Sequence, residues 1–299
     1  MAATRNDLST APGSWSMRRL PDMDEAQFDQ WQTLLEHRTG ISLAPERKSF
    51  LETNLGIRMR EIGCSSYQAY YEKVVSSPDA VVEWSTLVDR LTVQETRFFR
   101  DPDAFKLVAD YILTRPREVL KQRPLEAWSV GCSTGEEPYT LAMLLNESMN
   151  QLELPPLFGI TGSDISKPAI DKAQRGLFNA RKLLGMDEAL KTRYFRPAER
   201  NSVEIVERIR ERVCFTRLNV LDLKHAPMHG MNIIYCQNLL IYFRRWRRRE
   251  IVKRLAERLA PGGLLVLGQG ELTDWQPPGL QRVPSENVLA WIRRQSDEE

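Results

Sequence analysis

A glycine-containing turn follows a strand-like apolar run near the middle of the chain. Residues 128–139 read Trp-Ser-Val-Gly-Cys-Ser-Thr-Gly-Glu-Glu-Pro-Tyr. Gly131 and Gly135 permit a close approach of the backbone to a ligand, and Ser133 and Thr134 are predicted to cap the helix that follows. In a doubly wound α/β sheet, ligands lie beyond the carboxyl ends of the strands, so this turn is the first place to expect a binding site.

Apolar runs of this kind alternate with amphipathic helices through the second half of the chain. Asp101 and Pro102 predict the N-cap and the first residue of a helix that extends toward Leu120. Strands that alternate with helices pack as a parallel sheet with helices on both faces, and the sequence therefore predicts an α/β fold. The expected strands are 125–130, 157–162, 213–215, 232–235, 264–267 and 288–292.

The chain divides into three parts by composition and period. Residues 1–20 mix small, polar and basic residues without a period and are expected to form a flexible arm. Residues 21–91 have helical spacing throughout, with a first helix that ends at Gly40, and predict an all-helical domain. Residues 92–299 form the predicted α/β domain, in which residues 177–212 break into short charged pieces. We expect that stretch to be a small inserted β subdomain.

The composition argues against several classes of protein. The sequence of 299 residues has 42 Lys and Arg residues against 40 Asp and Glu residues, and a net charge of +2 is too small to imply a polyanionic partner. Its 4 cysteines include no CxxC pair, and with 3 histidines they fit neither a zinc site nor a disulfide framework, so we expect no metal. No apolar run suits a signal peptide or a membrane span. We therefore expect a cytoplasmic protein without membrane insertion.

The polar residues around the turn favour a cationic nucleoside as the ligand. Glu136 and Glu137 lie at a helix N-terminus, where carboxylates suit the helix dipole and a positive charge but repel a pyrophosphate. Asp164 follows the second expected strand, where a carboxylate accepts hydrogen bonds from ribose hydroxyls. Together these residues describe S-adenosylmethionine better than NAD or ATP. Two plainer interpretations stay open: the glycines form a structural turn, or Asp164 caps the helix from Ser166.

Five segments of the chain carry a family resemblance. They are Leu91 to Asp101, Gly135 to Tyr139, Ser163 to Ile165, Leu218 to Val220 and Cys236 to Phe243. In this order they resemble the CheR family, the chemotaxis receptor protein-glutamate O-methyltransferases, and the likeness runs from about residue 24 to residue 293. The resemblance implies a Rossmann-like class I methyltransferase domain preceded by a helical domain that docks on the receptor.

The resemblance also implies an activity and a set of site residues. The activity is methyl transfer from S-adenosylmethionine to glutamate side chains on the cytoplasmic helical signalling domains of chemoreceptors, with S-adenosylhomocysteine as product, in bacterial chemosensory adaptation. Arg100 and Tyr242 would lie near the transferring methyl group, and Asp164 would bind the ribose. The implied cofactor residues are Gln94, Thr96, Arg100, Glu136, Asp164, Asn219, Val220, Gln237 and Asn238.

The chemistry agrees with the absence of a well-placed histidine. A glutamate carboxylate has an ordinary pKa near ~4.3, so it is already a nucleophile at neutral pH and needs no general base. Arg100 would hold the incoming carboxylate by a bidentate pair, and Tyr242 would orient it. The family usually has Asn where Gln94 stands and Arg where Gln237 stands, so a fixed positive charge is lost at 237 and cofactor affinity is expected to differ.

Docking on the receptor is assigned to the second helix of the helical domain. In similar proteins this basic helix contacts acidic receptor helices; the residues concerned here are Arg47, Lys48, Arg58 and Arg60. Glu46, Glu52 and Glu61 dilute the charge, so a plain solvated face is an open alternative. Some members of the family bind a receptor tail peptide through a Gly-containing loop. The matching residues 196–202 contain no Gly, so tethering by a tail pentapeptide is not expected.

Two other functions fit parts of the sequence. Gln94 and Gln237 suggest a cofactor-binding regulatory module that has lost turnover. The arginine-rich run 244–249 suggests a nucleic-acid methyltransferase. We expect instead that this run begins an amphipathic helix that ends at Pro261-Gly262-Gly263, and we expect no nucleic-acid partner.

Overall fold

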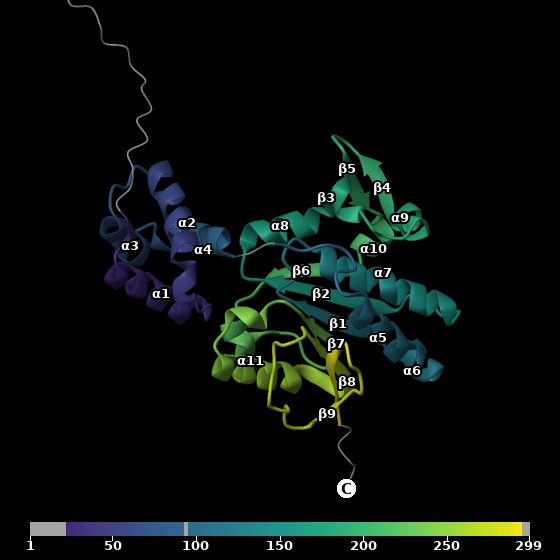
Figure 1. Ribbon diagram of the computed structural model, residues 1–299. Helices are drawn as coiled ribbons and strands as arrows, with labels where there is room; N and C mark the ends of the chain where they lie inside the picture. Colours follow the sequence, from purple (N-terminus) through teal and green to yellow (C-terminus); the bar gives the residue numbers. More distant parts are fainter. Residues whose placement is uncertain (1–21, 93–94, 295–299) are drawn as a thin grey trace, which may run out of the picture.

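The computed structural model describes residues 22–92 and 95–294. A bundle of helices at the N-terminal end packs beside a larger α/β domain, from which a small subdomain projects (Figure 1). The predicted arm, residues 1–20, lies outside the described residues. Within those ranges, no helix combines the length and the apolar character that crossing a membrane requires.

The helical domain has a compact core under four α-helices. Helix α1 begins with a capping box between Asp24 and Gln27 and ends at Gly40, whose φ of 77° is the left-handed geometry expected of a C-cap glycine. Trp31 is fully buried, and its ring packs against that of Tyr70 with the centres 5.4 Å apart and the planes tilted by 34°. The elements are α1 (Glu25–Thr39), η1 (Pro45–Arg47), α2 (Lys48–Glu61), α3 (Tyr67–Ser76) and α4 (Ala80–Leu91).

The α/β domain is built on a seven-stranded sheet with the order β6-β2-β1-β7-β8-β10-β9. The first five strands in this order are parallel to one another. At one edge, β10 pairs antiparallel with β8, and β9 pairs antiparallel with β10. The strands are β1 (Leu125–Val130), β2 (Phe158–Asp164), β6 (Val213–Arg217), β7 (Met231–Cys236), β8 (Leu259–Leu267), β9 (Leu280–Arg282) and β10 (Leu289–Arg293). The expected mostly parallel α/β fold is confirmed; β9 was not predicted.

Helices cover the sheet on both faces, each over its own apolar core (Figure 1). The helices and turns are α5 (Pro102–Leu113), α6 (Arg117–Gln122), α7 (Glu136–Gln151), α8 (Lys167–Arg175), η3 (Val220–His225), η4 (Leu240–Tyr242) and α11 (Arg245–Arg258).

Two predicted helix ends are wrong. The helix that begins at Asp101 and Pro102 stops at Leu113, because Pro116 disfavours helical geometry in the residue before it, and α6 starts separately. Helix α11 ends before Leu259, which already begins β8, so Pro261 to Gly263 lie inside the strand.

The predicted insertion is confirmed as a small β subdomain, which rises at the upper right of Figure 1. Its three strands form an antiparallel sheet with the order β3-β5-β4. The elements are β3 (Leu177–Asn179), η2 (Ala180–Leu183), α9 (Glu188–Tyr194), β4 (Phe195–Ala198), β5 (Ser202–Ile205) and α10 (Glu207–Arg210).

Candidate cofactor site

Two adjoining cavities lie beyond the carboxyl ends of β1, β2 and β7, where the fold was expected to bind a ligand. They share Gly131, Ser133, Asn238 and Tyr242. We call the first the apolar cavity, because Ile165, Leu218, Val220 and residues of the helical domain line it. We call the second the polar cavity; its polar lining includes Thr96, Arg100, Glu137 and Gln237.

The turn after β1 lies where the two cavities meet and contributes Gly131 and Ser133 to both. Gly131 has a φ of 76° and Ser133 one of 50°, and this geometry lets the N–H groups of Gly131 and Cys132 both donate to the carbonyl of Ser163. Gly135 is the N-cap of α7, with no side-chain cap, so the predicted capping by Ser133 or Thr134 is wrong. A Cβ on Gly135 would lie 2.8 Å from that of Ala173, so the glycine allows α7 to approach α8.

Asp164 ends β2 with its carboxylate fixed at the apolar cavity. One oxygen accepts from the N–H of Ser133 and the other from the N–H of Ser166, each at 2.9 Å. Burial raises the pKa of Asp164, and these backbone donors oppose the rise. Ser166 rather than Asp164 is the N-cap of α8, since its hydroxyl accepts from the N–H of Ala169. Each carboxylate oxygen retains acceptor capacity for a ligand hydroxyl.

The apolar cavity has walls from both domains. Asn219 and Val220 begin η3 on the α/β side, and the Asn219 amide donates at 2.9 Å to the carbonyl of Arg38 at the end of α1. Leu91 and two residues that follow α1, Ile41 and Leu43, close the cavity from the helical domain. Apolar walls on two sides suit a flat aromatic base.

The helical domain is attached close to this cavity. The N–H of Ser42 donates to the carbonyl of Tyr242 at 2.8 Å, and Arg244 forms an ion pair with Glu36 at 2.5 Å. A Cβ on Gly40 would lie 2.7 Å from the ring of Phe243, so this position also needs glycine for the close packing of the two domains. The helical domain and the cavity therefore share a boundary.

The polar cavity holds most of the predicted residues around the methyl group. Arg100 is exposed, and its guanidinium donates to the carbonyl of Glu95 at 2.8 Å. Tyr242 is half-buried between the two cavities. Asn238 has a φ of 56°, which turns the chain at the end of β7. Thr96 also lines this cavity, whereas Gln94 lies outside the described residues.

Gln237 occupies the position where the resemblance predicts a lost charge. Its amide accepts from the hydroxyl of Tyr235 at 3.0 Å and donates to the carboxylate of Asp101 at 2.9 Å. The same Asp101 carboxylate caps α5 through the N–H of Ala104. Gln237 therefore links the end of β7 to the start of α5 through an uncharged side-chain amide.

The two glutamates of the turn have different surroundings. Glu136, the predicted cofactor residue, is 1% exposed and lines neither cavity. It forms an ion pair with Lys182 at 3.0 Å and accepts from the Thr134 hydroxyl at 2.6 Å. Glu137 lines the polar cavity, accepts from the Ser129 hydroxyl at 2.7 Å, and burial raises its pKa to about 8.

Glu137 is therefore the site residue that the sequence reasoning missed. The sequence indicates that both glutamates suit a cation, but the family resemblance assigns only Glu136 to the cofactor. Successive residues of a helix point about 100° apart, so only one of two adjacent carboxylates is expected to face a given ligand. The sequence alone does not say which one.

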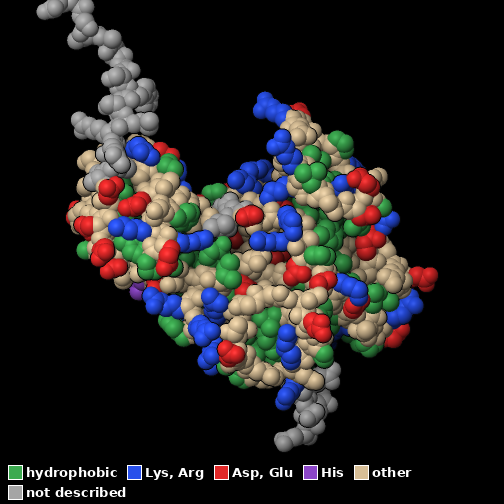
Figure 2. Space-filling view, viewed as in Figure 1, with side chains coloured by type: hydrophobic (Ala, Val, Ile, Leu, Met, Phe, Trp, Pro, Cys, Tyr) green, Lys and Arg blue, Asp and Glu red, His purple; other side chains and the backbone are tan. Residues whose placement is uncertain are grey.

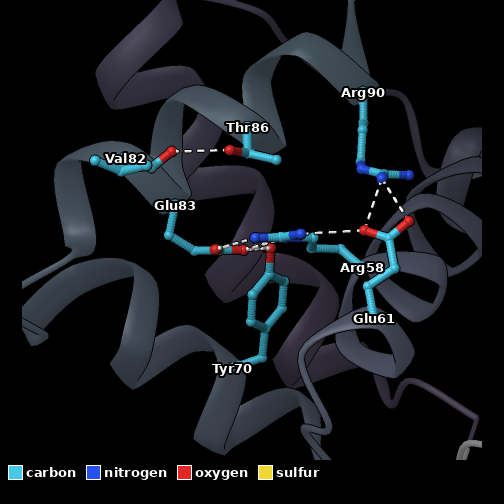
Figure 3. Close-up of polar contacts among 7 residues, drawn as sticks. All are labelled: Arg58, Glu61, Tyr70, Val82, Glu83, Thr86 and Arg90. Atoms are coloured by element: carbon cyan, nitrogen blue, oxygen red, sulfur yellow. Dashed lines mark hydrogen bonds and ion pairs between the residues drawn. The ribbon is translucent and has the colours of Figure 1, made fainter.

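The predicted docking residues separate into two groups. Arg47 ends η1 and lines the apolar cavity, with its guanidinium carbon 5.7 Å from the ring centre of Phe50. Lys48 is partly exposed and Arg60 is exposed. Arg58 belongs to an ion-pair network inside the helical domain, which Figure 3 shows.

That network joins α2, α3 and α4. The Arg58 guanidinium donates to both oxygens of Glu83, at 2.8 and 2.7 Å, and pairs with Glu61 at 3.1 Å (Figure 3). Tyr70 donates its hydroxyl to Glu83 at 2.8 Å, and Arg90 pairs with Glu61 at 2.6 Å. The hydrogen bonds from Arg58 lower the pKa of Glu83 despite its burial. Arg58 therefore has a structural role that the sequence did not reveal.

The arginine-rich run has contacts within the fold. Arg247 pairs with Glu250 at 2.7 Å, and Arg248 donates to the carbonyl of Phe243 at 2.7 Å. Val252 and Leu255 of the same helix are fully buried against the sheet. The run thus begins an amphipathic helix, as predicted.

In the described ranges, no group of three or more His, Cys, Asp and Glu side chains is arranged to hold a metal ion. The expectation that the protein works without a metal stays a prediction.

The mostly parallel sheet and the crevice at the carboxyl ends of β1, β2 and β7 are those expected of the S-adenosylmethionine-binding domain of a Rossmann-like methyltransferase. Residues 94–288 match the family model described as "CheR methyltransferase, SAM binding domain", and residues 26–92 match "CheR methyltransferase, all-alpha domain". The chain belongs to the CheR methyltransferase family, and the predicted resemblance is confirmed.

Relatives of known name cover most of the chain. Chemotaxis protein methyltransferase 2 of Pseudomonas aeruginosa is 33% identical over 247 residues, which are 82% of this chain and 85% of the relative. The chemotaxis protein methyltransferase of Escherichia coli is 30% identical over 253 residues, which are 83% of this chain and 85% of the relative.

Proposed function

We propose that this protein methylates glutamate side chains of chemoreceptors, with S-adenosylmethionine as donor, and yields glutamate methyl esters and S-adenosylhomocysteine. The names of its relatives supply the chemotaxis context. The observation that carries the proposal is the crevice itself, in which the half-buried carboxylates of Asp164 and Glu137 line adjoining cavities that meet at Tyr242.

Each cavity has the chemistry for one part of the cofactor. Asp164 would accept hydrogen bonds from the ribose hydroxyls, and Val220, Leu218 and Ile41 would bound the adenine. Glu137 would pair with the ammonium group of the methionine part, because its half-buried carboxylate lines the polar cavity. The cofactor supplies a methyl group activated by a sulfonium.

The acceptor needs positioning rather than a base. A bond forms between a carboxylate oxygen and the methyl carbon while the sulfur–methyl bond breaks, and no proton moves. Alignment of reacting groups can contribute on the order of 7 to 11 kcal/mol. Arg100 would hold the carboxylate through its guanidinium, and Tyr242, which lines the same cavity, would orient it.

The docking face is expected to be basic. Figure 2 shows the surface hollowed between the helical domain and the insertion, with Lys and Arg side chains gathered around the hollow. Exposed basic residues of α8 and the insertion include Lys172, Arg175, Arg181 and Arg196. With Arg47 and Arg60 they would attract the acidic signalling helices of a receptor. We retain the prediction that no tail pentapeptide and no nucleic acid is bound.

The test is methyl labelling with tritiated S-adenosylmethionine against a panel of cytoplasmic receptor fragments. Base-labile label on receptor glutamates supports the proposal. Cofactor binding without transfer to any fragment would instead favour a regulatory module. Label on RNA or DNA would favour a nucleic-acid methyltransferase.

A further inference from the structure

The linker of residues 95–100 forms one wall of the polar cavity. It carries Thr96 and Arg100, and both line the cavity. Within the linker, the Arg100 guanidinium donates to the carbonyl of Glu95 at 2.8 Å, and the Arg97 guanidinium donates to the carbonyl of Arg100 at 3.5 Å. Both bonds join residues of the linker itself, so they do not fix it relative to the rest of the domain, and the contacts behind the linker must do so.

The insertion packs behind the linker through aromatic rings. Phe98 is 6% exposed and lies edge-on to Phe178 of β3 and Phe195 of β4, with ring centres 5.0 and 5.2 Å away. The neighbouring N–H of Phe99 donates to the hydroxyl of Thr140 in α7 at 3.3 Å. Phe98 thus fixes the middle of the linker to the inserted subdomain.

Lys182 connects the same three parts by charge. Its ammonium group lies 2.6 Å from the carbonyl oxygen of Thr96 and 3.0 Å from the carboxylate of Glu136. Lys182 belongs to η2 of the insertion, Glu136 to the first turn of α7, and Thr96 to the linker. One cation therefore holds the cavity wall against the helix that starts at the β1 turn.

We propose that Lys182 is a positioning residue for the cofactor site. By donating to the Thr96 carbonyl while it is anchored on Glu136, it fixes the linker at the distance from Glu137 that the methionine part of the cofactor requires. Lys182 lines neither cavity, so it acts through the linker and not by contact with the ligand. This inference rests on the cofactor placement proposed above.

A simpler role must be distinguished from this one. Glu136 is almost fully buried, and a buried carboxylate is costly without a cationic partner. Lys182 would then only neutralise Glu136. The two roles predict different results when the charges of Lys182 and Glu136 are both removed. No unpaired buried charge then remains, but the hydrogen bond from Lys182 to the Thr96 carbonyl is still lost.

The test is calorimetric binding of S-adenosylhomocysteine, which needs no receptor. We expect Lys182→Met to weaken binding about 10-fold, the effect of one lost hydrogen bond from a charged group. Lys182→Arg should restore most of the affinity. The control is Lys191→Met in the same insertion, where the lysine pairs with the exposed Glu188, and it should bind as the parent does.

The double variant Lys182→Met with Glu136→Gln decides between the roles. It should regain the melting temperature that Lys182→Met lowers, but its binding of S-adenosylhomocysteine should stay as weak as that of Lys182→Met. Parent-like binding by the double variant, or by a folded Lys182→Met protein, would overturn the proposal. If no variant methylates a receptor fragment, the parent included, the proposed function fails while these affinities still decide the role of Lys182.

Discussion

Two carboxylates of this protein, the buried Glu83 and the half-buried Glu137, differ in their partners and in the direction of their pKa shifts. Glu83 in the helical domain accepts three hydrogen bonds, two from Arg58 and one from Tyr70, and these bonds lower its pKa. Glu137 in the polar cavity accepts one bond from Ser129, and burial raises its pKa to about 8. A buried acid that an arginine binds directly stabilises the fold, whereas Glu137, which faces a cavity and forms no ion pair within the described residues, is suited to a ligand cation.

The largest expected effect is on Asp164, the second cavity-facing acid. Asp164→Ala removes the acceptors proposed for two ribose hydroxyls and should weaken S-adenosylhomocysteine binding by roughly 100-fold or more. Calorimetry measures the affinity, and circular dichroism checks that the variant is folded. Binding within a few-fold of the parent would place the ribose elsewhere.

The matching change in the helical domain should act on stability instead. Glu83→Ala leaves Arg58 without its main partner and should lower the free energy of unfolding by about 3 kcal/mol. Denaturant unfolding measures this change. The folded variant should bind S-adenosylhomocysteine as the parent does, and a large loss of affinity would show that the network serves the site.

The pH dependence of cofactor binding tests Glu137. Its pKa near 8 means that the carboxyl is mostly protonated at neutral pH in the free protein. Only the ionised form pairs with an ammonium group, so affinity for S-adenosylmethionine should rise with pH by up to about tenfold per unit below that pKa. Binding should release a proton, which calorimetry in buffers of different ionisation enthalpy detects.

Glu137→Gln is the control for that dependence. The amide cannot ionise, so affinity should be lower near pH 7.5 and nearly flat with pH. The same raised pKa implies that the free protein loses stability through this group as pH rises from its unfolded value near 4.5 toward 8, because the folded state holds the proton more tightly. An unchanged pH profile in the variant would remove Glu137 from the site.

The smallest expected effect concerns Glu61, at the exposed end of the network. Its side chain is 41% exposed, although it pairs with Arg58 and Arg90. Exposed ion pairs contribute little because water and salt screen them. Glu61→Gln should therefore shift the melting temperature much less than Glu83→Ala, and equal shifts would contradict the distinction between buried and exposed pairs.

The sequence predicted most of the architecture because the signals were local. Asp101 and Pro102 start α5 as expected, Gly40 ends α1, and the apolar runs became strands of the sheet. One error overlooked a local signal, Pro116, which ends α5 earlier than expected, and the other arose where tertiary packing decides. The sequence did not show that β8 begins at Leu259, because the spacing of Val252, Leu255 and Leu259 also fits a helix that continues through Leu259.

The site was predicted in outline but not in every residue. Asp164, Asn219 and Tyr242 meet at one crevice although they are far apart in the chain. The choice between Glu136 and Glu137 depended on a lysine 46 positions later in sequence, Lys182, which pairs with Glu136. Arg58 could not be assigned for the same reason, because its partner Glu83 lies on another helix.

The most direct test of the account is a crystal structure of the protein soaked with S-adenosylhomocysteine. The account predicts ribose hydroxyls on the Asp164 carboxylate, the adenine between Val220 and Ile41, and the amino group within hydrogen-bonding distance of Glu137. An amino group directed at Glu136, or a crevice that stays empty at saturating ligand, would contradict it.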